Sequence, residues 1–166
     1  MPKSADPERN KIEAAVVRLL TQKKKTLALA ESCTGGFIAS QITNVPGASG
    51  IFPGGIVAYS NSVKGKFLGV RKTSLKNFGA VSENVAREMA EGARKKFGAD
   101  FALAVTGIAG PTGGTKSKPV GTVFIALAGA VETVVEHRVN RFAREKFKGI
   151  TAQQALELLL RQCNDL

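Results

Sequence analysis

The sequence predicts one α/β domain with a mixed sheet and helices on both faces. Short apolar segments alternate along the chain with segments whose apolar residues recur at helical spacing. The last two apolar segments follow each other directly, with only a glycine-containing turn between them, as in an antiparallel hairpin. A length of 166 residues and a hydrophobic content of 43% suit one domain with its own core, and we expect it to span residues 1–166.

The first expected element is a helix that begins at Asp6. Asp6 can cap it, Pro7 fits its first turn, and the lysine run 23–25 suits its C-terminal end, where the helix dipole favours cations. Its apolar stripe consists of Ile12, Ala15, Val16, Leu19 and Leu20.

Alternating strands and helices follow this first helix. The expected elements are, in order, a buried strand at 26–30, a helix at 34–43 that begins in two glycines, an apolar strand at 54–59, a turn and short helix at 60–70, and a longer helix from Ser82 to Gly98. The serine and the glycine are the usual caps of such a helix, and its apolar residues share one face.

The C-terminal half is expected to complete the sheet. A strand at 100–106 is apolar throughout its middle, as in strands that are covered on both faces. A glycine-rich loop at 107–119 leads into a hairpin of 120–129 and 131–139. The second hairpin strand alternates between apolar and polar residues, which predicts the edge of the sheet. A terminal helix at 142–163 follows.

The charge points toward a partner that carries phosphate. Lys and Arg number 24 against 13 Asp and Glu, a formal net charge of +11. The basic residues are scattered, however, with one Tyr and no Trp to interleave with them. We therefore expect a small nucleotide rather than nucleic acid as the main partner; DNA binding through the charge stays as an alternative that salt would weaken steeply.

Other classes of protein are disfavoured by composition. Cys33 and Cys163 lie near opposite ends of the chain and His137 is the single histidine, so a metal site is hard to assemble. We expect no metal and no cofactor. The sequence has no apolar run near the ~20 residues of a membrane span, and its first residues lack the core of a signal peptide, which predicts a cytoplasmic protein with no membrane partner.

Three polar segments leave apolar strands, and all are rich in hydroxyls and glycines. They are "ESCTGG" at 31–36, "YSNSVK" at 59–64 and "TGIAGPTGG" at 106–114. Ligands of open α/β sheets collect at the carboxyl ends of the strands. The joint placement of the segments is the strongest functional indication in the sequence.

A nucleophile in this site would need a base other than histidine. His137 lies in the expected edge strand, so a lysine is the obvious base. Burial would lower the pKa of the lysine, so that its amine is neutral near pH 7 and can accept a proton. Lys64 follows a strand and a turn, where partial burial is expected. Ser32 lies at a strand-to-helix junction, where free amides can stabilise an oxyanion, and Gly35 and Gly36 would let a substrate approach the backbone.

The residues around Ser32 allow other interpretations of their roles. Ser32 or Thr34 can simply cap the following helix. Cys33 is a rival nucleophile, although a cysteine after a buried strand is more often inert. Glu31 can orient a polar partner or meet a positively charged substrate ring. The glycine segment 106–114 lacks the spacing of the known phosphate loops, so an anion-binding nest or a substrate-shaping loop remains open.

Five ordered motifs, "AESCTGG", "YSNSVK", "GAVSE", "TGIAGPTGG" and "KPVGTV", resemble the CinA C-terminal domain family over nearly the whole chain. Stand-alone members of this family include nicotinamide mononucleotide deamidases. The resemblance implies a three-layer α/β/α fold with a mixed, mostly parallel sheet, and an amidohydrolase that releases ammonia from the carboxamide of that nucleotide. The family's nucleophilic serine falls on Ser32 and its lysine on Lys64, with Tyr59 nearby.

The resemblance also implies a pocket for a small nucleotide. The substrate-binding residues expected there are Glu31, Cys33, Thr34, Gly35, Gly36, Asn61, Thr106, Gly107, Gly110, Gly113, Gly114 and Arg144. Many members carry Gly-Asp before the arginine, where this chain has Phe142 and Ala143. Arg144 and Lys148 keep the charges, which can contact a substrate phosphate or merely solvate the terminal helix.

Two further expectations complete the interpretation. Family habit and the sheet edge favour a homo-oligomer, with a dimer as the guess. The alternative to an enzyme is a nucleotide-binding or interaction module linked to competence or DNA damage.

Overall fold

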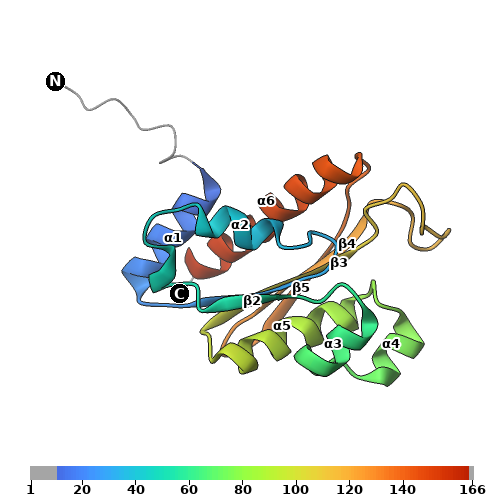
Figure 1. Ribbon diagram of the computed structural model, residues 1–166, viewed down its shortest axis with the longest axis horizontal. Helices are drawn as coiled ribbons and strands as arrows, with labels where there is room; N and C mark the ends of the chain where they lie inside the picture. The colour runs from blue at the N-terminus through green and yellow to red at the C-terminus, as the bar shows by residue number, and fades with distance from the viewer. Residues whose placement is uncertain (1–10, 165–166) are drawn as a thin grey trace.

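The centre of the structure, a computed structural model that describes residues 11–164, is a mixed sheet of five strands in the order β2-β1-β3-β4-β5 (Figure 1). The strands are β1 (Leu27–Glu31), β2 (Gly54–Val57), β3 (Phe101–Gly107), β4 (Thr122–Ala128) and β5 (Thr133–Val139). β1 pairs in parallel with β2 and β3, and β4 pairs antiparallel with β3 and β5. Four of the five strands therefore run in one direction, and the expected mixed, mostly parallel sheet is confirmed.

Helices cover both faces of this sheet, which makes the expected three layers (Figure 1). They are α1 (Ile12–Lys23), α2 (Phe37–Thr43), α3 (Asn61–Leu68), α4 (Lys72–Phe78), α5 (Glu83–Phe97) and α6 (Arg144–Asn164), with a 3₁₀ turn, η2, at Ala48–Gly50. α1, α2 and α6 lie on one face, and α3, α4 and α5 lie on the other. No helix within residues 11–164 combines the length and apolar character that crossing a membrane requires.

The strands present residues of different size to the two faces. Leucine, isoleucine and valine side chains such as Leu29, Leu103 and Ile125 pack with α1, α2 and α6. The alternate positions face α5 and are alanines: Ala28, Ala30, Ala102, Ala104, Ala126 and Ala128. Because successive residues of a strand point to opposite faces, this alternation sorts large and small side chains, and the alanine face lets α5 lie close.

A glycine brings α5 close to α3. A Cβ atom on Gly92 of α5 would lie 1.8 Å from the carbonyl oxygen of Leu68, at the end of α3. The two backbones therefore meet at a distance that only glycine allows. This contact holds α3, which follows β2, against the α5 layer.

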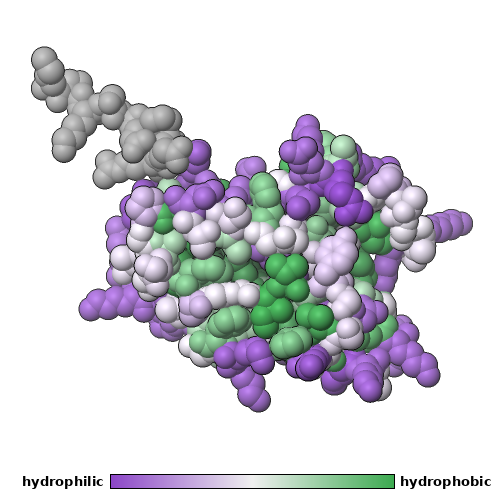
Figure 2. All heavy atoms as spheres, viewed as in Figure 1, coloured by the Kyte–Doolittle hydropathy of each residue, from purple (hydrophilic) through white to green (hydrophobic). Residues whose placement is uncertain are grey.

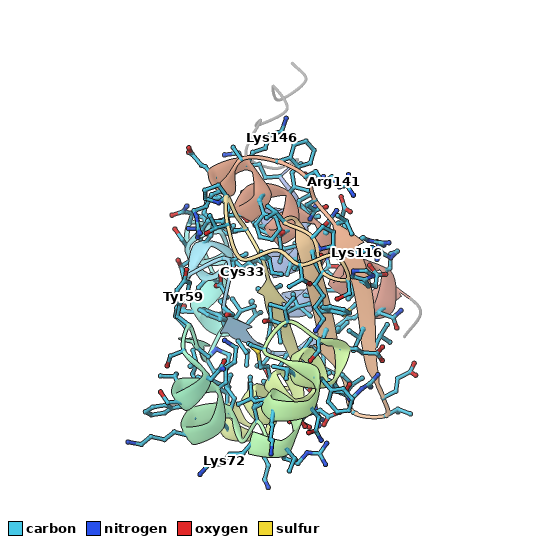
Figure 3. The ribbon with its side chains drawn as sticks, turned by 90° about the vertical axis from the view of Figure 1, so that its right-hand side faces the viewer. Cys33, Tyr59, Lys72, Lys116, Arg141 and Lys146 are labelled. Atoms are coloured by element: carbon cyan, nitrogen blue, oxygen red, sulfur yellow. The ribbon has the colours of Figure 1, made fainter. Side chains whose placement is uncertain are left out.

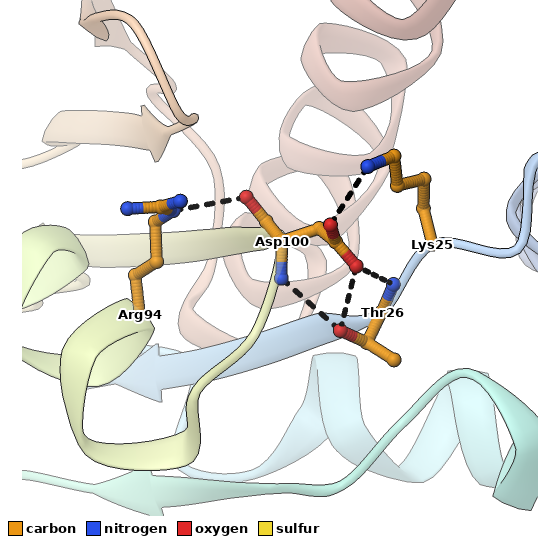
Figure 4. A network of polar contacts seen from close by, with 4 residues as sticks. All are labelled: Lys25, Thr26, Arg94 and Asp100. Carbon is orange, nitrogen blue, oxygen red and sulfur yellow. Dashed lines mark hydrogen bonds and ion pairs between the residues drawn. The ribbon is translucent and has the colours of Figure 1, made fainter.

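Asp100 fixes the start of β1 beside the start of β3 (Figure 4). Its carboxylate accepts from Lys25 Nζ at 2.8 Å and from the amide and hydroxyl of Thr26 at 3.0 and 3.1 Å. The guanidinium Nε of Arg94 donates to the Asp100 carbonyl at 3.0 Å. The register that pairs Leu27 with Phe101 follows directly from this anchor.

The structure shifts some boundaries of the expected elements. α1 begins at Ile12 with Lys11 at its N-cap, and the predicted cap Asp6 and Pro7 lie outside the described residues. α4 was not expected at all. Its first turn is held by the carboxylate of Glu88, which accepts from the Arg71 amide at 2.9 Å and from the Ser74 hydroxyl at 2.6 Å.

Hydrophilic side chains cover most of the rim in the view of Figure 2, and apolar residues show between them near the centre. The predicted edge strand is confirmed, because β5 has a strand neighbour on one side only. β2 forms the opposite edge.

Candidate active site

Ser32 and Lys64 meet at the carboxyl end of β1. The amide of Ser32 donates to the Val105 carbonyl at 3.0 Å, so its backbone continues the pairing of β1 with β3 by one residue. Lys64 Nζ lies 2.9 Å from Ser32 Oγ. It also donates to the carbonyls of Ala58 at 2.8 Å and Tyr59 at 3.2 Å. Lys64 is only 1% exposed, so its side chain is largely shielded from bulk water.

The local sequence explains how Lys64 reaches this position. Ser60 caps α3 by accepting from the Val63 amide at 3.3 Å, which starts the helix directly after the polar turn. Lys64 then lies one helical turn further on, on the face of α3 that is turned to the sheet. Lys66, two positions later, is exposed.

Burial lowers the pKa of Lys64 from its ordinary value of 10.5, because the charged form loses its hydration. A neutral amine has two N–H donors and one lone pair. The three partners of Nζ match this set: two carbonyls take the donors, and the hydroxyl of Ser32 can donate to the lone pair. The arrangement is that of a base poised to take the proton of Ser32.

Cys33, the rival nucleophile, stays protonated. Burial raises the pKa of its thiol to about 12, against smaller opposite effects of its own amide and that of Thr34. A thiol in this state is a poor nucleophile, since the thiolate is the reactive form. Of the two candidates in this turn, only Ser32 has a hydrogen-bonded base.

The role of Glu31 in the structure differs from the substrate-binding role that was expected. Its side chain, 1% exposed, accepts from the amides of Gly36 at 3.1 Å, Ile38 at 3.1 Å and Ala39 at 2.8 Å. It therefore caps α2, in place of Ser32 or Thr34, and does not face the cavity. This is also why α2 begins at Phe37 rather than at residue 34.

The turn between β1 and α2 leaves two amides available. The Gly35 amide donates to the Ser32 carbonyl at 3.1 Å, and the Gly36 amide is taken by Glu31. In the described part of the chain, no oxygen acceptor is paired with the amides of Cys33 and Thr34. These two amides are therefore the donors that an oxyanion beside Ser32 could use. The hydroxyl of Thr34 is fully buried and has no hydrogen-bond partner among residues 11–164.

A cavity of about 270 Å³ opens over the Ser32–Lys64 pair. Figure 3 views this edge of the sheet, with Cys33 deep between the layers and Tyr59 nearer the surface. The predicted site residues that line the cavity are Ser32, Cys33, Tyr59, Asn61, Lys64, Thr106, Gly107, Gly110, Gly113 and Arg144. They come from both sides of the sheet edge and from the glycine loop.

The remaining predicted residues lie outside the cavity lining: Glu31, Thr34, Gly35, Gly36 and Gly114. Gly114 instead allows a tight turn of the loop, since a Cβ there would lie 2.6 Å from the Val120 amide nitrogen. The lining residues that the sequence did not single out are Ala80, Val81, Ile108, Ala109 and Thr112. The "GAVSE" motif was the one indication for the first two, and Thr106 Oγ1 donates to the Ala80 carbonyl at 2.8 Å.

The charge of the cavity is positive. Among the described residues that line it, Arg144 is a permanent cation, Lys64 becomes a second cation when it takes a proton, and none is a carboxylate. Lys116, Arg141 and Lys146 project from the same side of the molecule (Figure 3). The site therefore suits an anionic ligand.

A larger hollow, of about 640 Å³, lies between α1 and residues 44–47. The hydroxyl among its lining residues, Thr21 Oγ1, donates to the Val17 carbonyl at 2.7 Å within α1. Among the described residues that line it, the hollow thus has no hydroxyl paired with a base, whereas the smaller cavity has the Ser32–Lys64 pair.

We expect Glu31→Ala to destabilise the fold strongly. It would leave three amides of the α2 turn without their acceptor, at a cost of about 3 kcal/mol in the free energy of unfolding. Urea denaturation followed by circular dichroism measures this cost. The matched control is Glu83→Ala, which removes an exposed ion pair with Arg87 and is expected to cost about 0.5 kcal/mol or less. Equal losses in the two variants would contradict the capping role.

The fold and this site define a three-layer α/β/α protein with a buried serine–lysine pair at the carboxyl edge of its sheet. The family model of the CinA C-terminal domain matches residues 9–163. The chain therefore belongs to the CinA C-terminal domain family.

Relatives and solved structures agree with this assignment. A CinA-like protein of Thermotoga neapolitana is 51% identical over 149 residues, which cover 90% of this chain and 36% of that protein. A CinA-like protein of Syntrophus aciditrophicus is 52% identical over 151 residues, covering 90% and 36%. The chain thus spans just over a third of the length of these curated relatives.

The crystal structure of the competence/damage inducible protein CihA from Agrobacterium tumefaciens matches with a TM-score of 0.90 at 37% identity, covering 96% of this chain and 97% of that one. A CinA superfamily protein from Escherichia coli matches with a TM-score of 0.87 at 33% identity, covering 96% and 94%. These structures share the single-domain architecture described above.

Proposed function

We propose that this domain is an amidohydrolase that removes ammonia from the carboxamide of nicotinamide mononucleotide. The observation that carries the proposal is the 2.9 Å contact between Lys64 Nζ and Ser32 Oγ in a buried site. The lowered pKa of Lys64 supports the role of base, and the resemblance of the motifs to those of the deamidases supports the substrate.

The reaction would run in two halves. Neutral Lys64 takes the proton of Ser32, whose oxygen attacks the carboxamide carbon, and the amides of Cys33 and Thr34 stabilise the oxyanion. Protonated Lys64 then gives its proton to the leaving nitrogen, which departs as ammonia and leaves an ester on Ser32. Water, deprotonated by Lys64, hydrolyses the ester to nicotinate mononucleotide, and the proton returns to Ser32.

The cavity supports a small anionic substrate. Its volume of about 270 Å³ is of the order expected for a small-molecule site, and Arg144 supplies a cation in its lining. A phosphate beside Arg144 would be held by charge-assisted hydrogen bonds. Tyr59 lines the cavity and is 64% exposed, and in this proposal it would cover the bound ring.

Ammonia release from nicotinamide mononucleotide tests the proposal, with nicotinamide as the control substrate. Release from the nucleotide but not from nicotinamide supports it. No release by folded protein that still binds the nucleotide would favour the alternative, a nucleotide-binding module.

The pH dependence follows from the base. Lys64 acts only when neutral, so kcat/KM is expected to rise as pH increases toward the lowered pKa of Lys64 and to level off above it. On the acid side the rate should fall about tenfold per pH unit, because one proton blocks the base. Initial rates of ammonia release across buffers of constant ionic strength measure this profile. A rate that stays constant across the acid range would contradict a lysine base.

A further inference from the structure

The connection from β5 to α6 brings Arg144 into the cavity, although residues 141–146 are all exposed. Phe147, the fourth residue of α6, packs in the core, whereas the exposed residues before it are fixed less by packing. Asn140, the residue before this segment, is by contrast only 6% exposed. The contacts of Asn140 therefore add to the packing of Phe147 in holding the start of α6.

Asn140 forms a reciprocal amide pair with Gln154, almost three turns into α6. Its Nδ2 donates to Gln154 Oε1 at 2.8 Å, and Gln154 Nε2 donates back to Asn140 Oδ1 at 3.1 Å. The same Nδ2 donates to Thr151 Oγ1 at 3.3 Å. The side chain of Asn140 thus ties the end of β5 to the body of α6.

The backbone of Asn140 continues this connection to the glycine loop. Its amide donates to the Gly121 carbonyl at 2.8 Å, and the Gly121 amide donates to the carbonyl of Ile108 at 2.8 Å. Ile108 lines the cavity. A Cβ on Gly121 would lie 2.6 Å from the Asn140 carbonyl oxygen, so the two backbones lie in direct contact.

We propose that Asn140 is a positioning residue for the site. It holds the first turn of α6 at a fixed distance from the glycine loop, and so keeps Arg144 in the cavity wall where an anionic group of the substrate would bind. Asn140 does not line the cavity and acts through Arg144. This inference rests on the proposed function for its kinetic readout, but its structural readout is independent of catalysis.

Kinetics provide the first test. Asn140→Ala is expected to raise KM for nicotinamide mononucleotide about tenfold while kcat changes less than about twofold, since the lost contact is to a remote phosphate. With nicotinamide riboside, which lacks the phosphate, the variant should behave like the wild type. In an Arg144→Ala background, Asn140→Ala should add no further effect.

Matched variants separate positioning from general damage. Gln154→Ala should reproduce the effect of Asn140→Ala, and Gln154→Glu, which keeps the acceptor of the 2.8 Å bond, should restore part of the wild-type KM. Gln153→Ala is the control on the same helix, because Gln153 is exposed and donates to Glu157 Oε1 at 2.9 Å, away from Asn140. An unchanged KM in both Asn140→Ala and Gln154→Ala, or equal losses with mononucleotide and riboside, would overturn the inference.

Hydrogen exchange provides the second test. Asn140→Ala should accelerate amide exchange in residues 141–149 and leave β1 and β3 protected, whereas Gln153→Ala should change neither. If the wild type releases no ammonia, the proposed function fails and the exchange result alone decides the inference. Unchanged exchange in residues 141–149 would refute the positioning role whatever the kinetics.

Discussion

Replacing Ser32 by alanine is expected to abolish the deamidation of nicotinamide mononucleotide. The variant loses the atom that attacks the carboxamide, and the loss of a nucleophile of this kind lowers kcat by a factor on the order of 10⁴ or more. Ammonia release under saturating substrate measures the effect. Binding of the nucleotide should persist, because Arg144 and the glycine loop are untouched.

Cys33→Ala is the matched control for this experiment. It changes the neighbouring residue of the same turn and removes the other nucleophile, whose pKa of about 12 keeps it protonated. Its kcat should stay within about threefold of the wild type, since a buried thiol contributes only packing. Full activity in Ser32→Ala combined with loss in Cys33→Ala would reverse the assignment of the nucleophile.

Lys64→Arg is expected to be as inactive as a variant without any base. Arginine can donate to the same carbonyls, but it stays protonated in proteins and so cannot accept the proton of Ser32. General-base catalysis contributes about 10²- to 10⁴-fold, so kcat should fall by at least that factor. The measurement is the rate of ammonia release, with circular dichroism to show that the variant is folded.

Two controls give this result its meaning. Lys66→Met removes an exposed lysine of the same helix and should leave kcat unchanged.

Lys64→Met should change the dependence of stability on pH. Burial lowers the pKa of Lys64 in the folded state below the value of the unfolded chain, so the wild type gains stability as pH rises between these two values. Lys64→Met should lack this gain, and a Lys64→Arg protein with normal kcat would exclude lysine as the base.

The fold was largely predictable because its strands are short apolar runs between polar turns and amphipathic segments. Alternating buried strands and amphipathic helices lead to a layered α/β domain, and the late hairpin predicts the antiparallel pairings that the structure shows. α5 is the clearest case: Ser82 caps it, Gly98 ends it at a φ of 60°, and its expected apolar face is the one turned to the sheet.

The parts that the sequence did not predict depend on residues distant in the chain. α4 has only a short apolar pattern of its own, and its first turn is held by Glu88 from α5. The start of α2 was misplaced for a different reason. Its amides are capped by the carboxylate of Glu31, which precedes the turn, whereas a serine or threonine at the usual N-cap position was expected.

The site was predictable as a set of segments but not as a set of contacts. The scarcity of histidine pointed to a serine with a lysine base, and the structure brings Ser32 and Lys64 together across 32 positions of sequence. Which glycines line the cavity could not be predicted. Gly113 lies in the lining and its neighbour Gly114 lies against Val120, a difference that arises from the path of the loop.

The antiparallel hairpin determines at which edge of the sheet the chain places Arg144. β4 carries the backbone away from the edge that holds Ser32, and β5 carries it back, so two reversals cancel. The chain therefore re-emerges beside the nucleophile and begins α6 there with Arg144. With a single reversal, the final helix would start at the opposite end of the sheet, near Asp100, and its arginine would face the wrong edge.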